Sequence, residues 1–113
     1  MSEVEPKVEL LWWQECPSWE RALAGLRSEM EALGLDPDSI EVREVDTETA
    51  AAREEFVGSP TIRINGEDVQ PPGEDEPVGL TCRVYRHRNG RISPLPDWDE
   101  VRETLSRLAT GRS

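Results

Sequence analysis

A cysteine at position 16 of this 113-residue chain stands directly before Pro17, where a tight turn leads into a helix. A thiol at the start of a helix faces unpaired backbone N–H groups and the positive end of the helix dipole, which favour the thiolate. The acidic neighbours Glu15 and Glu20 act in the opposite sense. Polar Glu15 and Ser18 argue against deep burial. The sequence therefore predicts a functional thiol at Cys16, with a small buried hydrophobe as the alternative.

The second cysteine of the chain is Cys82, and it is the only possible disulfide partner for Cys16. Neither cysteine has another cysteine three residues away, which excludes a Cys-x-x-Cys dithiol and a zinc knuckle. Cys82 is either a core residue that faces inward beside Leu80 and Val84, or the partner of Cys16. Pairing requires Cα atoms roughly 4.4 to 6.8 Å apart, a distance that the sequence leaves open.

The segment around Cys82 concentrates positive charge within an otherwise acidic chain. Its members are Arg83, Arg86, His87, Arg88 and Arg91. Such a run could lower the pKa of Cys82 or receive an anion. We favour the alternative, a solvated hairpin whose arginines balance nearby acidic side chains.

The charge and composition of the chain limit the kinds of partner that it can bind. The chain has 24 acidic and 13 basic residues and a formal net charge of −11, so we expect no nucleic-acid partner and no membrane partner. No stretch approaches the roughly 18 apolar residues of a membrane span, and the first seven residues are too acidic and polar for a signal peptide. We therefore expect a single cytoplasmic domain over residues 1–113, without a cofactor. The only histidine, His87, makes a hydrolytic triad or a four-ligand Cys/His zinc site implausible.

The hydrophobic pattern predicts the strands and helices around these cysteines. Residues 8–13 form an apolar run typical of a central strand that is buried on both faces. A helix follows from Pro17, and Gly34 marks its end. Its apolar face is predicted to contain Trp19, Leu23, Leu26, Met30 and Leu33. Residues 39–45 alternate and predict a second strand, parallel to the first.

The second half of the chain is predicted to continue with a helix over residues 49–56, capped by Asp46 or Thr47. A strand over residues 61–64 leads through the turn Asn65-Gly66 into a short return strand over residues 67–69.

After that hairpin we expect an exposed loop over residues 70–77. Residues 80–85 form either a strand, with a turn at Asn89-Gly90, or irregular structure. Residues 97–100 match a capping box for a terminal helix. The apolar face of that helix is predicted to contain Trp98, Val101, Leu105 and Leu108.

The resulting α/β order, β-α-β-α-β-β-α with an irregular insertion before the last helix, resembles the thioredoxin fold, a central mixed sheet flanked by helices. Residues 15–19, 58–61, 64–66 and 79–85 resemble small bacterial thioredoxin-like proteins, some of them labelled alkylmercury-lyase-like. The likeness spans residues 8–108. It implies that Cys16 is the nucleophile and that Pro60 is a cis-proline beside it. Trp19 stands where a thioredoxin has its second cysteine, so exchange within a Cys-x-x-Cys motif is excluded.

These observations predict a thiol protein that acts through Cys16, with Cys16, Pro60 and Cys82 as the catalytic residues. The chemistry is monothiol exchange or a Cys16/Cys82 redox pair, and the partner is a small molecule or protein that bears a thiol or disulfide. One alternative is binding of a soft metal, mercury or copper(I), by the thiolates of Cys16 and Cys82. Another is a non-catalytic interaction domain on the same fold.

Overall fold

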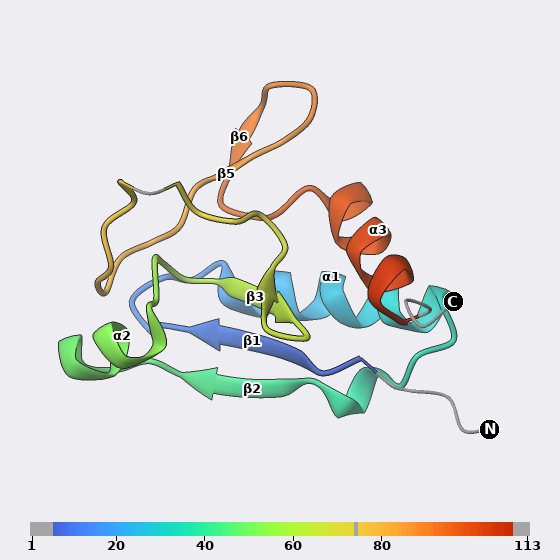
Figure 1. The fold of residues 1–113 in the computed structure, drawn as a ribbon, viewed down its shortest axis with the longest axis horizontal. Helices are drawn as coiled ribbons and strands as arrows, with labels where there is room; N and C mark the ends of the chain where they lie inside the picture. The colour runs from blue at the N-terminus through green and yellow to red at the C-terminus, as the bar shows by residue number, and fades with distance from the viewer. Residues whose placement is uncertain (1–5, 74, 110–113) are drawn as a thin grey trace.

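A four-stranded mixed sheet forms the centre of the computed structural model, which describes residues 6–73 and 75–109 (Figure 1). Its strands, in spatial order, are β2 (Glu41–Glu44), β1 (Val8–Trp12), β3 (Thr61–Ile64) and β4 (Glu67–Asp68). Strand β1 pairs in parallel with β2 and antiparallel with β3, and β4 pairs antiparallel with β3. The mixed sheet and the parallel first pair confirm the sequence prediction.

The helices lie on both sides of this sheet. They are α1 (Trp19–Ala32), the 3₁₀ turn η1 (Pro37–Ser39), α2 (Glu48–Glu54) and α3 (Trp98–Ala109). Residues alternate between the two faces along β1, so Leu10 packs into a core shared with α1 and α3, whereas Leu11 packs into a smaller cluster with α2. Strand β1 is buried on both faces, as its apolar run predicts.

The predicted element order is wrong in the segment before the last helix. That segment contains a two-stranded hairpin, β5 (Tyr85–Arg86) with β6 (Ile92–Ser93), which projects from the body of the molecule in Figure 1. Its turn is at Asn89-Gly90, where Gly90 takes a positive φ and His87 N donates to Arg91 O. Residues 80–84 form no regular strand, because their β-type backbone pairing is limited to one isolated bridge between Ser59 and Cys82.

Local signals at two turns are confirmed. Asn65 and Gly66 have φ values of 54° and 82°, and positive φ at both central positions is what a type I′ hairpin requires. Thr47 caps α2 by accepting a hydrogen bond from the Ala50 N–H at 3.0 Å. These elements depend on contacts within four residues of sequence, so they follow directly from it.

The predicted start of the first helix is wrong, whereas its predicted stop at Gly34 is confirmed. Helix α1 begins at Trp19 after the cap residue Ser18, so Pro17 lies before the helix and not in its first turn. Leu33 is the C-cap residue and is exposed, because the helix ends there and Gly34, with φ of 76°, turns the chain away.

The predicted capping box of α3 is only half formed. Asp97 accepts a hydrogen bond from Asp99 N at 3.0 Å, as an N-cap does, and another from Arg88 N at 3.0 Å. Glu100, however, lies 3.3 Å from Arg88 Nε instead of returning to the cap backbone, because the β5–β6 hairpin places a cation beside it. The hydrogen bond from Arg88 N, reinforced by that from Asp99 N, lowers the pKa of Asp97.

Within the described residues, no helix is long and apolar enough to cross a membrane. Residues 70–73 and 75–77 form the predicted loop, exposed from residue 71 onward, and position 74 lies outside the described residues. Residues 1–5, part of the N-terminal segment that argues against a signal peptide, also lie outside them.

Candidate functional site

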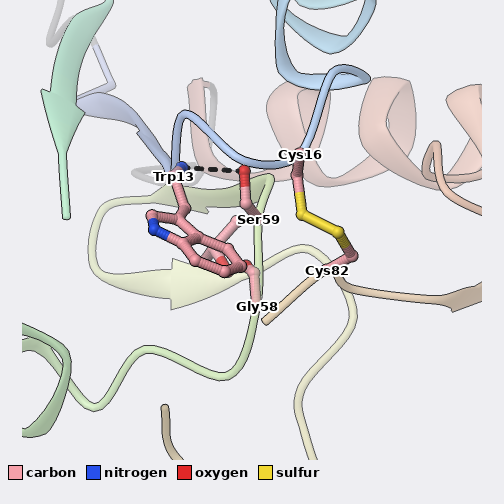
Figure 2. The surroundings of a disulfide bond; sticks show 6 residues. Trp13, Cys16, Gly58, Ser59 and Cys82 are labelled. Carbon is pink, nitrogen blue, oxygen red and sulfur yellow. Dashed lines mark hydrogen bonds between the residues drawn. A yellow bond between two sulfur atoms is a disulfide. The ribbon is translucent and has the colours of Figure 1, made fainter. Parts of the chain in front are cut away.

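The two cysteines of the chain meet in the folded protein. A disulfide joins Cys16 to Cys82, with a Cα–Cα distance of 5.7 Å across 66 residues of sequence (Figure 2). The distance lies within the range that a disulfide requires. The inward-facing core position considered for Cys82 is therefore wrong, since Cys82 is exposed and paired.

A tight turn after β1 directs Cys16 into the protein. The Cys16 N–H donates to Trp13 O at 3.0 Å. The Trp13 N–H donates to Ser59 Oγ at 2.9 Å, the dashed line in Figure 2. Cys16 is 0 % exposed, so the expectation that it avoids deep burial is wrong. Glu15 is exposed and Ser18 is half-buried. In a turn, neighbouring side chains point in different directions, so polar neighbours say little about the residue between them.

Ser59 holds the two cysteine-bearing segments together. Its N–H donates to Thr81 O at 2.8 Å, and its carbonyl accepts from Arg83 N at 2.9 Å, which makes the parallel bridge between Ser59 and Cys82. Its hydroxyl accepts from Trp13, as above. One residue therefore fixes both the turn that carries Cys16 and the backbone that carries Cys82.

Arg83 anchors the Cys82 segment from within the protein. It is 3 % exposed, Nη1 lies 2.8 Å from Asp68 Oδ2, and Nη2 donates to Gln70 O at 2.5 Å. The guanidinium also lies over the Tyr85 ring, 4.5 Å from its centroid. The expectation of a solvated arginine is thus wrong at this position, because Asp68 on β4 supplies a buried counter-charge.

Tyr85 ties the same segment to the proline predicted as a site residue. Its phenol donates to Pro60 O at 2.5 Å. Burial raises the pKa of Tyr85 above its ordinary value, and the opposing effect of the Arg83 cation is smaller. The Ser59–Pro60 peptide bond is cis, as the resemblance implies, and Pro60 is buried. Cys16, Pro60 and Cys82 therefore belong to one connected region.

In the rest of the basic run, Arg88 contacts the last helix. Arg88 donates to Glu103 at 2.9 Å and contacts Glu100, and His87 Nε2 lies 2.8 Å from Leu95 O. Arg86 and Arg91 are exposed. For Arg88 this confirms the expected balance with nearby acidic side chains, and it directs that charge toward α3 rather than toward Cys82.

Cys82 lines two pockets. The first, of about 310 Å³, is lined by Pro17, Ser18, Arg21, Cys82 and Pro94. The second, of about 210 Å³, is lined by Val57, Glu76, Pro77, Thr81, Cys82, Arg83 and Val84. Cys82 lines both pockets and Cys16 lines neither, so the two sulfurs differ in their access to a ligand.

Trp19, which the resemblance aligns with the second cysteine of a thioredoxin, has a packing role. Its ring stacks on Trp12, with centroids 4.1 Å apart and planes 21° apart. Both rings are half-buried against the main core. The stack connects the end of β1 to the first turn of α1, on either side of the Cys16 turn.

Sequence reasoning missed the residues that position this site. Gly58, Ser59, Arg83 and Tyr85 bring Cys82 to Cys16, and Asp68 balances the buried arginine. The pattern Gly58-Ser59-Pro60 is a sequence signal for the bridge to Cys82. Nothing in the sequence distinguishes the buried Arg83 from the exposed arginines that follow it.

The described residues contain no group of three or more His, Cys, Asp or Glu side chains arranged to hold a metal ion. The two sulfurs are joined to each other, so soft-metal binding by the same pair when it is reduced stays a prediction.

Comparisons with known proteins return no match for this chain, whether with protein-family models, curated proteins or solved structures.

Proposed function

We propose that this chain is a thiol–disulfide exchange protein on a thioredoxin-like fold, cycling between the Cys16–Cys82 disulfide and the dithiol. In reduction, a substrate thiolate forms a bond to one of the two sulfurs, and the other sulfur leaves with the electron pair and takes up a proton. A second substrate thiolate attacks the substrate sulfur of this mixed disulfide. That step releases the oxidised substrate as its disulfide and leaves both cysteines as thiols, so two electrons pass in all.

Non-covalent contacts hold Cys82 in place, and this is the main support for the proposal. The bridge between Ser59 and Cys82, the buried Arg83–Asp68 pair and the hydrogen bond from Tyr85 to Pro60 all act on residues 81–85 without the disulfide. A sulfur pair held in this way can open and close again, because the two thiols remain neighbours after reduction.

Access to the bond supports the same function. A disulfide that only cross-links a small domain needs no opening to solvent, whereas an exchanging one must admit a thiolate. Cys82 is exposed and lines two pockets.

Two features of the chain support a thioredoxin-like fold. The unit β1-α1-β2 has parallel strands, and the cis Ser59–Pro60 bond lies directly before β3 and close to the disulfide. The cis bond is what the resemblance to thioredoxins implies, and the parallel pair is what the strand–helix–strand pattern predicts. The β5–β6 hairpin before α3 is a departure from the expected order.

The test is a redox titration of the folded protein in dithiothreitol buffers of stepped potential, with alkylation and intact mass reporting free thiols. We expect both thiols to appear together in one two-electron transition, while circular dichroism shows that the fold persists. Cys16→Ser and Cys82→Ser variants, each with one thiol, should show no such transition. A disulfide that is reduced only when the protein unfolds would be a structural cross-link, and the proposal would be wrong.

A further inference from the structure

The two halves of the disulfide differ in what can reach them. Cys16 is 0 % exposed and lines neither of the two pockets described above, whereas Cys82 is exposed and lines both. Thiol–disulfide exchange proceeds by attack at one chosen sulfur, and access decides which one. An incoming thiolate therefore meets Cys82, and Cys16 is the sulfur that leaves.

The larger of the two pockets carries a charge of one sign. Arg21, on the first turns of α1, is the only charged side chain among the residues that line it. No ion pair within the described part of the chain involves Arg21, although several other arginines are paired. In a protein of net charge −11, this pocket is a local site for a negative group.

The pocket also suits a small ligand. Its volume of about 310 Å³ lies at the lower end of the range for small-molecule sites, and two prolines give it an apolar surface. The second pocket, by contrast, contains the acidic Glu76 and is smaller. A compound with a thiol and a carboxylate can place its sulfur at Cys82 and its carboxylate toward Arg21.

We infer that Cys82 is the exchange cysteine, and that the pocket of Pro17, Ser18, Arg21 and Pro94 beside it receives a small thiol that bears a carboxylate. This inference rests on the proposed function. The thiolate forms a bond to Cys82 Sγ, the Cys16–Cys82 bond breaks, and Cys16 Sγ leaves with the electron pair and then takes a proton. Cys16 is the resolving residue, the reverse of the role that the resemblance implies for it.

The first experiment assigns the cysteines. Folded Cys16→Ser and Cys82→Ser variants are mixed with the disulfide of N-acetylcysteine, and mass spectrometry follows the mixed disulfide. We expect Cys82 in the first variant to react about tenfold faster or more than Cys16 in the second, because Cys16 is buried. In denaturant, where neither thiol is buried, the two rates should converge.

Faster reaction of Cys16 in the folded state would overturn the assignment while leaving the proposed function intact. If both thiols react only in denaturant, the proposed function itself fails. The two failures are therefore distinguishable.

The second experiment tests the carboxylate with the oxidised wild-type protein. The rate of disulfide reduction by N-acetylcysteine is compared with that by N-acetylcysteine amide, each divided by its thiolate fraction. We expect the carboxylate to give a rate about two- to fivefold higher at low salt, an advantage that falls as salt is added.

Two arginine variants of helix α1 test whether Arg21 causes the advantage of the carboxylate. Arg21→Gln should remove the advantage of the carboxylate, and Arg27→Gln, which alters an exposed arginine of α1 outside the pocket, should keep it. A wild-type protein that reacts equally fast or faster with the amide would overturn the inferred ligand class, as would an advantage that survives Arg21→Gln.

Discussion

Gly58 lies so close to Arg83 that a β-carbon built at position 58 would come within 2.8 Å of Arg83 Cβ and 2.9 Å of its Cα. Gly58 also has a φ of 142°, a backbone conformation that L side chains rarely adopt. This close approach allows Ser59, the next residue, to bridge to Cys82. The distance between the two cysteines thus depends on a glycine that bears no reactive group.

Gly58→Ala should destabilise the oxidised protein by about 1–3 kcal/mol, because the added methyl group meets the Cβ and the backbone of Arg83 rather than the flexible end of a side chain. Urea denaturation measures the change. Gly73→Ala is the control, since nothing lies within 4 Å of a β-carbon there, and it should change stability by less than about 0.5 kcal/mol. Equal effects of the two substitutions would contradict the close approach.

Removing the disulfide should lower the free energy of unfolding by about 4 kcal/mol, since the bond closes a loop across 66 residues in the unfolded chain. Denaturation with and without dithiothreitol measures this difference. The Cys16→Ala/Cys82→Ala double variant should match the reduced wild-type protein and be insensitive to reductant. A much smaller loss would mean that the unfolded chain is already compact across this loop.

Asp68→Ala should cost about 3–5 kcal/mol, because it leaves the buried guanidinium of Arg83 without its counter-charge. Glu67→Ala is the control on the same strand. Its ion pair with Arg107 measures 2.6 Å, but both side chains are about half exposed, so we expect a loss of about 0–1 kcal/mol. Thermal or urea denaturation compares them. Adding Arg83→Met to Asp68→Ala should recover part of the loss, and no recovery would argue against an unpaired buried charge as the cause.

Asp97→Ala should destabilise the protein by about 0.5–2 kcal/mol near neutral pH, since Asp97 caps α3. The pKa of Asp97 is lowered in the folded state, mainly by the hydrogen bond from Arg88 N. A carboxylate with a lowered folded pKa contributes stability above its unfolded pKa, about 3.9, and loses it as the pH falls through the folded value.

The stability difference between wild type and Asp97→Ala should therefore shrink as the pH is lowered below about 4. Urea denaturation at stepped pH measures it, with Asp99→Ala, which removes a neighbouring exposed carboxylate, as the control for general charge effects. A difference that stays constant down to pH 2 would exclude the Asp97 carboxylate as its source.

Much of the fold follows from short-range patterns. The apolar run of β1, the face of α1 that contains Leu26 and Met30, and the turn at Asn65-Gly66 depend on residues close in sequence, and all three appear where the pattern predicts them. The prediction failed where distant segments intervene. The β5–β6 hairpin brings Arg88 to Glu100, so Glu100 contacts Arg88 instead of the backbone at the start of α3.

The residues that could carry thiol chemistry are evident in the sequence, because Cys16 and Cys82 are the only two cysteines, and the pattern around Cys16 predicts a turn before the first helix. That the two cysteines meet, that Cys16 is buried and that Cys82 is exposed became clear only from the folded chain. These properties depend on residues that are far apart in sequence. The distance between the two cysteines depends on how the segment from Gly58 packs on that around Arg83, and no periodicity or local propensity reports such a long-range contact.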